Sequence, residues 1–238
     1  MAKDILSSIQ QHYAMWQERG IAGVSWEKSG LHQFNFLRVH GLQRYHKLLD
    51  IGCSCLRGGI HFIDYLDVGH YYGFDKEPEL VGFAWEEIKK RNLESKKPTV
   101  ETVNNFSMEI ARDVMFDFML AQSVFTHIKP NLVRLCFESI LPHLKQNGKF
   151  FATIHEGDEL NISEDRQPWR KTGDEMRQVF YPASYMREIA EYYGMEMTYI
   201  GQWASPSDGS NCRFCKRPHP DDTDNQTMLL FTKEVHEL

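Results

Sequence analysis

The feature that most constrains the fold is an alternation of short apolar segments with amphipathic helical segments, which begins at residue 47. We predict five strands and three helices in this part of the chain. The strands cover residues 47–52, 70–75, 99–105, 116–122 and 149–154, and the helices cover residues 60–66, 78–91 and 130–144. Strands and helices that alternate in this way are connected by right-handed crossovers. The sequence therefore predicts an α/β fold, with a doubly wound, mostly parallel sheet and helices on both faces.

The two flanks of this alternation have a different character. In residues 1–45, apolar residues recur at helical spacing and are interrupted by glycines, so we predict an N-terminal helical extension or lid. Near the C-terminus, a helix around Ile189 precedes a strand pair at residues 195–200 and 227–232. The polar stretch 205–225 between these strands is long for a compact domain, which is typical of functional loops.

Length and charge narrow the classes of function. The chain has 238 residues, so residues 46–238 fit one domain. Its 33 acidic and 27 basic side chains give a net charge of -6, which repels nucleic acid phosphates and anionic lipids. There is no run of about 18 apolar residues, the length that a membrane span requires. The five cysteines, an odd number, favour reduced thiols in a cytoplasm. We expect a cytoplasmic protein that binds neither nucleic acid nor a membrane.

A glycine turn follows the first predicted strand, at the sheet edge where doubly wound folds bind ligands. Gly52 permits a tight turn and a close approach of the backbone to a ligand. The turn fails as a dinucleotide fingerprint, because Ser54 and Arg57 stand where the second and third glycines would be. Asp75 follows Gly52 by 23 positions, a spacing that suits a carboxylate binding ribose hydroxyls. Alternatively, Asp75 caps the helix that begins near Pro78.

Four ordered segments together resemble class I S-adenosylmethionine-dependent methyltransferases. They are Leu48–Gly59, Tyr72–Asp75, Phe116–His127 and Leu141–Phe150. The resemblance covers roughly residues 30–200 and is strongest to the small-molecule type, whose first motif ends in Leu-Arg-Gly-Gly, here residues 56–59.

This resemblance implies a seven-stranded sheet with an antiparallel last strand and S-adenosylmethionine as the cofactor. It places Asp50 and Gly52 beside the methionine part of the cofactor, Asp75 at the ribose and Phe106 near the adenine. The residues expected to bind the cofactor are Asp50, Gly52, Cys53, Ser54, Arg57, Asp75, Lys76, Phe106, Gln122 and Ser123. The chain departs from many members at Ser54 and Leu56, where glycine is common, and these side chains make the methionine pocket tighter.

Two residues are candidates for the chemistry of methyl transfer. If the acceptor is a hydroxyl, its proton must leave, and a histidine, with a pKa of about 6.5, is a natural recipient. His127 follows the fourth predicted strand and is our candidate base; its alternative role is packing or capping at the turn before Pro130. Glu156, just past the fifth strand, either orients the acceptor or is an exposed loop charge.

Two further groups lie in the flanks. The side chains of Tyr13, Trp16, Arg19 and Trp26 are candidates for an acceptor-binding lid, or else an apolar helical face packed on the sheet. Cys212, Cys215 and His219 have plausible zinc spacing, although structural zinc sites normally have a full set of four ligands. An ordinary surface loop with reduced thiols is the alternative.

The sequence as a whole predicts an enzyme that transfers a methyl group from S-adenosylmethionine to a hydroxyl, amine or carboxyl group of a small molecule. Three alternatives share the predicted sheet: a nicotinamide-dependent oxidoreductase, a non-catalytic binding module, and a protein or RNA methyltransferase. The net charge disfavours RNA.

Overall fold

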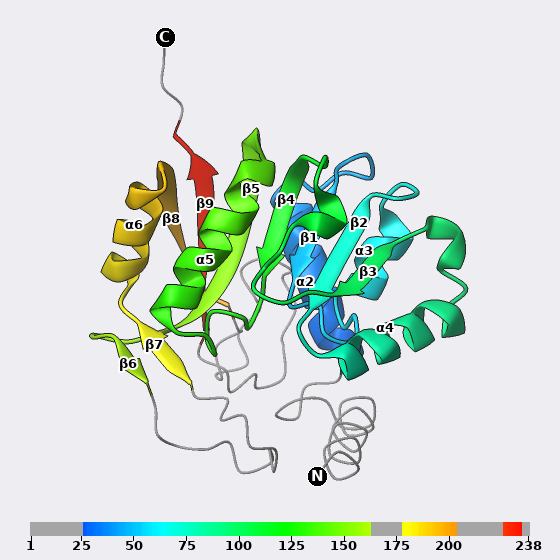
Figure 1. Cartoon of the computed structure of the whole chain (residues 1–238), viewed down its shortest axis with the longest axis horizontal. Coiled ribbons are helices and arrows are strands. Elements are labelled where there is room, and N and C mark those ends of the chain that lie inside the picture. The colour runs from blue at the N-terminus through cyan, green and yellow to red at the C-terminus, as the bar shows by residue number, and fades with distance from the viewer. Residues whose placement is uncertain (1–25, 163–177, 204–225, 235–238) are drawn as a thin grey trace.

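The computed structural model describes residues 26–162, 178–203 and 226–234, which form one sheet with helices on both faces (Figure 1). The strands are β1 (Leu48–Ile51), β2 (Tyr71–Asp75), β3 (Thr99–Thr102), β4 (Phe116–Ala121), β5 (Leu144–Glu156), β6 (Asn161–Ile162), β7 (Val179–Tyr181), β8 (Met195–Gln202) and β9 (Gln226–Lys233). The helices are α2 (Trp26–Val39), α3 (Gly59–Tyr65), α4 (Pro78–Lys90), α5 (Pro130–Ile140) and α6 (Ala183–Tyr192), and short 3-10 turns cover Glu94–Lys96, Glu109–Ala111 and Leu141–His143.

Seven of these strands form the main sheet, in the order β3-β2-β1-β4-β5-β9-β8. Strands β1 to β5 are parallel to one another, and β9 is antiparallel to both of its neighbours, β5 and β8. The predicted fold, a mostly parallel doubly wound sheet with an antiparallel last strand, is confirmed. Because β1 to β5 run in one direction, their carboxyl ends meet at one edge of the sheet.

A short hairpin extends the sheet beyond its predicted strands. β7 pairs in parallel with the last two residues of β5, His155 and Glu156, and β6 pairs antiparallel with β7. The backbone amide of Val179 donates to the carbonyl of Thr126, 2.9 Å away, so the hairpin also holds the loop that follows β4. These two strands are not predicted from the sequence, because each has too few residues to produce an alternating pattern.

The predicted helix 130–144 is too long. Helix α5 ends at Ile140, a 3-10 turn follows, and β5 begins at Leu144. Pro142 explains the early end, since proline lacks the backbone N–H that would continue the helix and its ring clashes with the carbonyl of the residue four positions earlier. Gly148 lies inside β5.

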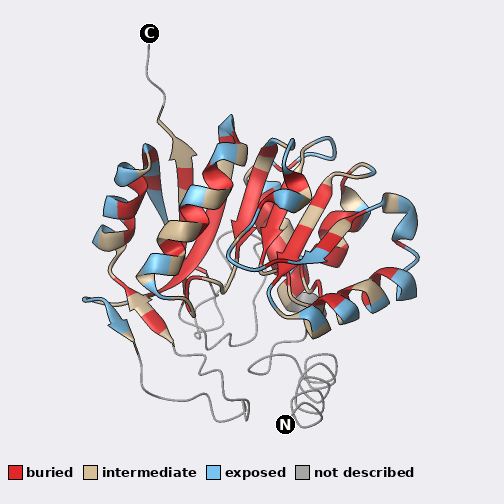
Figure 2. Ribbon diagram, in the orientation of Figure 1, coloured by how far each residue is buried: buried red, intermediate tan, exposed pale blue. Residues whose placement is uncertain are grey.

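Helices cover the sheet on two sides, and each side has its own core. Helices α5 and α6 supply Phe137, Ile140 and Ile189, among others, to one buried cluster. Helices α2, α3 and α4 supply Phe36, Phe62 and others to the second cluster. Figure 2 shows the strands buried between these two layers. A sheet covered on both faces leaves its strand ends as the natural place for a ligand.

Candidate active site

The glycine turn after β1 lies at the carboxyl edge of the sheet and is held by its neighbours. The backbone amides of Gly52 and Cys53 both donate to the carbonyl of Phe74 in β2, at 2.8 and 2.9 Å. Gly52 has φ +69°, and an added Cβ would lie 2.7 Å from Cγ2 of Val124, in the loop after β4. Only glycine combines this backbone conformation with so close a neighbour. The turn is thus fixed between β2 and the β4 loop.

Backbone strain concentrates at the same edge. Seven described non-glycine residues have positive φ, and two of these, Asn92 and Lys97, end helical turns. The others follow β1, β3 and β4: Ser54, Leu56, Asn105, Phe106 and Ser123, with φ between 52° and 64°. Left-handed backbone at a non-glycine residue costs about 1–2 kcal/mol, and such strain gathers at ligand-binding sites. Ser54 and Leu56 therefore have the left-handed backbone that glycine adopts most easily, despite their side chains.

Asp50, the third residue of β1, is a buried acid at the base of this turn, with only 6% of its surface exposed. The Tyr71 hydroxyl donates a hydrogen bond of 2.7 Å to its Oδ2 atom. Burial raises the pKa of Asp50 to about 7; Asp75 raises it further, while the Tyr71 hydrogen bond and Arg57 oppose the shift. The site therefore contains a carboxyl group that titrates near neutral pH and is stabilised as an anion by any cation bound beside it.

Asp75, the last residue of β2, organises the turn from the neighbouring strand. Its two carboxylate oxygens accept the backbone amides of Ser54 and Glu77, each at 3.0 Å. Helix α4 has Glu77 as its N-terminal flanking residue, without a side-chain cap, so Asp75 does not cap α4 in the predicted way. Burial is the main cause that raises the pKa of Asp75. A carboxylate has about four lone-pair sites, so two remain for a ligand.

Five polar side chains, which we call the amide cluster, join distant parts of the chain beside the turn. They are Gln33 of α2, Arg57, Gln122, Ser123 and Gln226 of β9. Oε1 of Gln122 accepts hydrogen bonds from Nε2 of Gln33 and, at 3.0 Å, from Nη2 of Arg57. Nε2 of Gln122 donates to the Ser123 hydroxyl at 2.7 Å, and so does Nε2 of Gln226 at 2.8 Å. Among the described residues, Arg57 has no other hydrogen-bond partner, so its remaining donors are available.

The Gly58-Gly59 pair has steric reasons to be glycine. A Cβ on Gly58 would overlap Oε1 of Gln33, and a Cβ on Gly59 would lie 2.5 Å from the Tyr71 hydroxyl. Gly58 thus leaves space for the side chain of Gln33, and Gly59 leaves space for the Tyr71 hydroxyl that donates to Asp50. Sequence reasoning missed Gln33, Tyr71 and Gln226, because they reach the site through side-chain contacts that no sequence pattern reveals.

The two thiols beside the turn are buried and stay protonated. Cys53 and Cys55 are free cysteines with 5% and 1% of their surfaces exposed. Burial raises the pKa of both, and for Cys53 the nearby acids Asp50 and Asp75 add to the effect. A thiol without its charged form is a poor nucleophile, so these residues pack the turn and do no chemistry.

The candidate base, His127, lies in the loop after β4, facing the end of β5. Its ring centroid is 6.3 Å from that of His155, in an edge-to-face arrangement. β7 holds this loop from the other side, since the Tyr181 hydroxyl donates to the Ile128 carbonyl at 2.6 Å. His127 is thus placed at the carboxyl edge, and its catalytic role stays a prediction.

Glu156 ends β5 and is held by two hydroxyl groups. Its Oε2 atom accepts from Tyr199 of β8 at 2.7 Å and from Thr227 of β9 at 2.8 Å. The carboxylate is therefore tied to the β8–β9 side of the edge, away from the glycine turn on β1. Its role toward the acceptor stays a prediction.

The other predicted site residues differ in their burial, and several lie outside the described residues. Lys76 is exposed and pairs with Glu77 at 3.3 Å, while Phe106 is half-buried and packs edge-to-face on Phe74. Trp26 is buried, with the Arg91 guanidinium 5.6 Å from its ring, which is a core environment. Tyr13, Trp16, Arg19, Cys212, Cys215 and His219 lie outside the described residues. Within the described ranges, no three His, Cys, Asp or Glu side chains are grouped to hold a metal ion.

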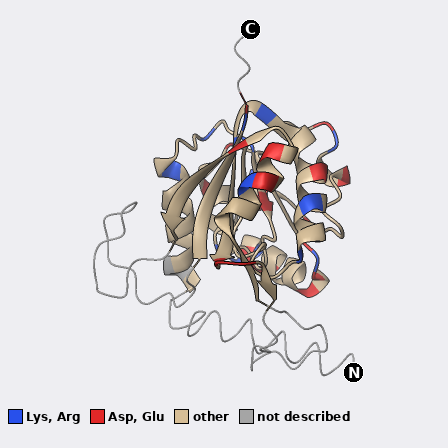
Figure 3. Cartoon of the chain, turned by 90° about the vertical axis from the view of Figure 1, so that its left-hand side faces the viewer, with Lys and Arg blue, Asp and Glu red and all other residues tan. Residues whose placement is uncertain are grey.

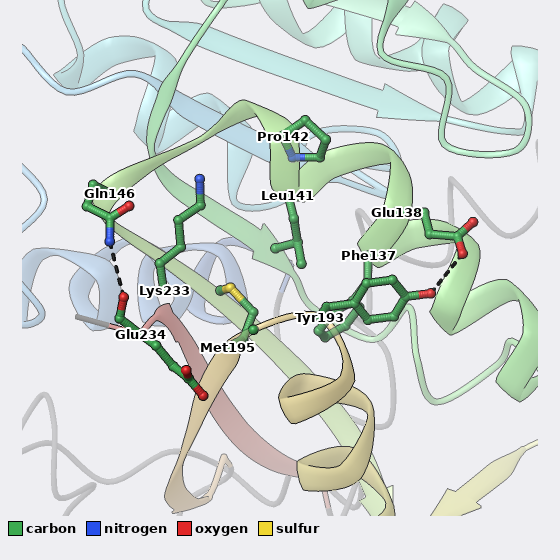
Figure 4. Close-up of a pocket in the computed structure, with 10 residues that line it drawn as sticks. Phe137, Glu138, Leu141, Pro142, Gln146, Tyr193, Met195, Lys233 and Glu234 are labelled. Carbon is green, nitrogen blue, oxygen red and sulfur yellow. Dashed lines mark hydrogen bonds between the residues drawn. The ribbon is translucent and has the colours of Figure 1, made fainter. Parts of the chain in front are cut away.

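A surface hollow of about 570 Å³ lies elsewhere, between the end of α5, the start of β8 and the end of β9 (Figure 4). Buried Phe137, Leu141 and Met195 are among its lining residues, and the Tyr193 hydroxyl donates to Glu138 across it at 3.0 Å. β5 begins here at Leu144, so the hollow is at the amino edge of the sheet. It is not part of the candidate active site.

Known proteins are similar to the part of the chain that forms the carboxyl edge of the sheet. A protein-family model described as "Methyltransferase domain" matches residues 49–152, from β1 to the middle of β5. Over these residues the chain is similar to methyltransferase domains. The matched region contains the glycine turn, Asp50, Asp75 and the loop after β4, and the prediction of a methyltransferase-type enzyme is confirmed.

Solved structures with the same fold extend over nearly the whole chain. An S-adenosylmethionine-dependent methyltransferase from Clostridium acetobutylicum ATCC 824 is 12% identical with a TM-score of 0.64, covering 95% of this chain and 99% of that one. Magnesium protoporphyrin IX methyltransferase from Synechocystis PCC 6803, solved with bound SAM, is 13% identical with a TM-score of 0.62, covering 94% and 91%. The glycopeptide N-methyltransferase MtfA, complexed with S-adenosyl-L-methionine, is 12% identical with a TM-score of 0.59, covering 86% and 94%. At such identities the likeness is one of fold.

Proposed function

We propose that this chain transfers a methyl group from S-adenosylmethionine to a small-molecule acceptor. The observation that carries the proposal is the pair of buried acids, Asp50 and Asp75, at a glycine turn within the region that is similar to methyltransferase domains. S-adenosylmethionine has a sulfonium and an ammonium cation and a ribose diol. Buried carboxylates stabilise cations and accept hydrogen bonds from hydroxyl groups. The residues present therefore fit this cofactor, and the Synechocystis enzyme and MtfA were both solved with it.

The same geometry argues against the nicotinamide alternative. A dinucleotide fold uses the amides of its glycine turn to bind the pyrophosphate. Here the Ser54 amide is already engaged by Asp75, at 3.0 Å. In its ionised form, the Asp75 carboxylate beside this amide also repels an anionic ligand such as pyrophosphate. A ligand with a net positive charge suits this turn better than a dinucleotide does.

Each side chain then has a specific task. Bound S-adenosylmethionine supplies an activated methyl group on its sulfonium, so the protein mainly has to align the acceptor with it. Orientation of this kind contributes on the order of 7–11 kcal/mol. Asp50 would hold the cationic methionine part and Asp75 the ribose hydroxyls. The amide cluster lies between α2, the β4 loop and β9, where Arg57 and Gln122 can orient an acceptor by hydrogen bonds. His127 would accept the proton of a hydroxyl acceptor.

The surface supports a small-molecule acceptor over nucleic acid. Acidic and basic residues are interspersed over the helices and turns that face the viewer in Figure 3, and the chain has a net charge of -6. Phosphate backbones are bound by concentrated positive charge, and the described residues on this face do not form such a patch. None of the helices in the described ranges is long and apolar enough to cross a bilayer. The free thiols of Cys53, Cys55 and Cys136 suit a reducing compartment such as the cytoplasm.

A label-transfer assay tests the proposal. The full chain is incubated with methyl-labelled S-adenosylmethionine and a panel of small hydroxyl, amine and carboxylic acid acceptors, and the label is followed into each acceptor. Labelling of at least one acceptor, reduced in the Asp50→Ala variant, is the expected result. Cofactor binding without transfer to any panel member would favour the non-catalytic binding module, and labelling of protein or RNA alone would refute the small-molecule assignment.

A further inference from the structure

Two glycines leave space for the hydroxyl group of Tyr71 to form a hydrogen bond with Asp50. The Tyr71 ring is buried in β2, with 2% of its surface exposed, and its hydroxyl reaches Oδ2 of Asp50 at 2.7 Å. Both neighbours of that hydroxyl are glycines: an added Cβ would lie 2.5 Å from it at Gly59 and 2.9 Å at Gly73. Any larger residue at either position would push the hydroxyl away from the acid. Two elements, the start of α3 and strand β2, thus leave room for one hydrogen bond.

This hydrogen bond has a defined chemical direction. Tyrosine donates its proton, and burial raises the pKa of the Tyr71 hydroxyl, so it stays a donor over the whole physiological range. A donor stabilises the charged form of a carboxylate and opposes the burial that would otherwise keep Asp50 neutral. Around Asp50, the groups that carry or can acquire charge are Asp75 on β2, Arg57 and Cys53 of the turn, and Tyr71 itself. Among these, Tyr71 is the one that bonds to the carboxylate directly.

We propose that Tyr71 is a positioning residue of the cofactor site, whose hydroxyl holds Asp50 as a charged carboxylate beside the glycine turn for the cationic methionine part of the ligand. This inference rests on the proposed function. It adds a residue that acts on the cofactor through another side chain, and it sets the pH range over which the cofactor is bound. Since only the carboxylate form of Asp50 attracts a cation, cofactor affinity rises with pH as Asp50 loses its proton.

The test is the pH dependence of S-adenosylhomocysteine binding, measured by calorimetry from about pH 5.5 to about pH 8.5, around the Asp50 pKa of about 7. In the wild type, affinity should rise through this range. Tyr71→Phe removes the donor while preserving the ring, so the midpoint of the rise should move up by about one pH unit, with affinity about fivefold weaker at pH 7 and about tenfold weaker at the acid end of the range. In Asp50→Asn, which cannot titrate, the rise should be absent.

Tyr193→Phe is the matched control. It removes another tyrosine-to-carboxylate hydrogen bond, the one to Glu138 at 3.0 Å, at the opposite edge of the sheet. Its binding profile should equal that of the wild type. Gly59→Ala offers a second route to the same effect, since its Cβ crowds the Tyr71 hydroxyl and should also shift the midpoint upward; it replaces Tyr71→Phe if that variant does not fold.

The outcomes separate the inference from the proposed function. A midpoint that stays at the wild-type pH in Tyr71→Phe, with an equal loss of affinity at every pH, would mean that Tyr71 only packs the strand, and would overturn the inference alone. A wild-type protein that binds no S-adenosylhomocysteine at any pH would overturn the proposed function and the inference together.

Discussion

Replacing Gly58 by alanine tests whether α2 is an integral part of the site. Gly58 precedes α3 with φ -84° and ψ -35°, a helical conformation that alanine adopts without strain. The cost is therefore steric alone: the new Cβ would overlap Oε1 of Gln33 and would lie 3.1 Å from its Cδ. Gln33 would have to turn away from Gln122, which leaves a buried amide unpaired at about 1–3 kcal/mol. Alanine restores about 0.4–1 kcal/mol through the unfolded state, so we expect a net loss of about 1–2 kcal/mol.

Urea unfolding measures this loss of stability. Two further variants, a control and a partner for a double-mutant cycle, show whether the loss comes from the contact with Gln33. Gly82→Ala is the control, because Gly82 lies within α4 with no atom near an added Cβ, and it should stabilise the protein by about 0.5–1 kcal/mol. Gln33→Ala removes the Oε1 and Cδ atoms and keeps only the Cβ of residue 33, 3.3 Å from the added Cβ, so Gly58→Ala in that background should cost much less than in the wild type. The coupling energy of the cycle is then about 1–3 kcal/mol. Additive single and double variants, or a Gly58→Ala protein as stable as Gly82→Ala, would refute the contact between α2 and the turn.

Four further variants test other parts of the site. Asp75→Ala should weaken S-adenosylhomocysteine binding by about 1.5–3 kcal/mol in calorimetry, whereas unchanged affinity would leave Asp75 as a support of the turn only. Ser54→Gly should raise the unfolding free energy by about 1 kcal/mol, because serine is held at φ 52°; no gain would mean that the turn is unstrained. For Asp50, the folded-state pKa lies above its ordinary value of 3.8, so wild-type stability should fall as pH rises from about 4 to about 7, and Asp50→Asn should lack this slope. His127→Ala should lower turnover about a hundredfold with cofactor affinity intact, and a fully active variant would exclude His127 as the base.

The sheet could be predicted because its strands are buried on both faces. Such strands appear as short, nearly continuous apolar runs, as in residues 48–51 and 116–121, and proline or glycine marks the helices between them. Boundaries failed where a single residue overrides the pattern, as Pro142 does at the end of α5. The β6–β7 hairpin was not predicted, because it forms by pairing with the end of β5 and its few residues have almost no pattern of their own.

The residues of the candidate site likewise fall into two groups, those that the sequence pattern predicts and those that it does not. Gly52 and Asp75 could be predicted, because the first directly follows a strand, the second ends one, and the topology brings strand ends together. Asp50, inside β1, was expected only from the family resemblance. Gln33 and Gln226 could not be predicted, since they meet Gln122 across 89 and 104 positions of sequence and through side chains alone. Amides far apart in a sequence have no spacing that reveals such a contact.

We infer that the edge of buried acids binds a cationic nucleoside and not a dinucleotide. Calorimetric titration of the full chain with S-adenosylmethionine, S-adenosylhomocysteine and a nicotinamide dinucleotide tests it directly. We predict that both sulfur nucleosides bind with one-to-one stoichiometry, that Asp75→Ala weakens both, and that the dinucleotide gives no heat of binding. Binding of the dinucleotide alone would contradict the account.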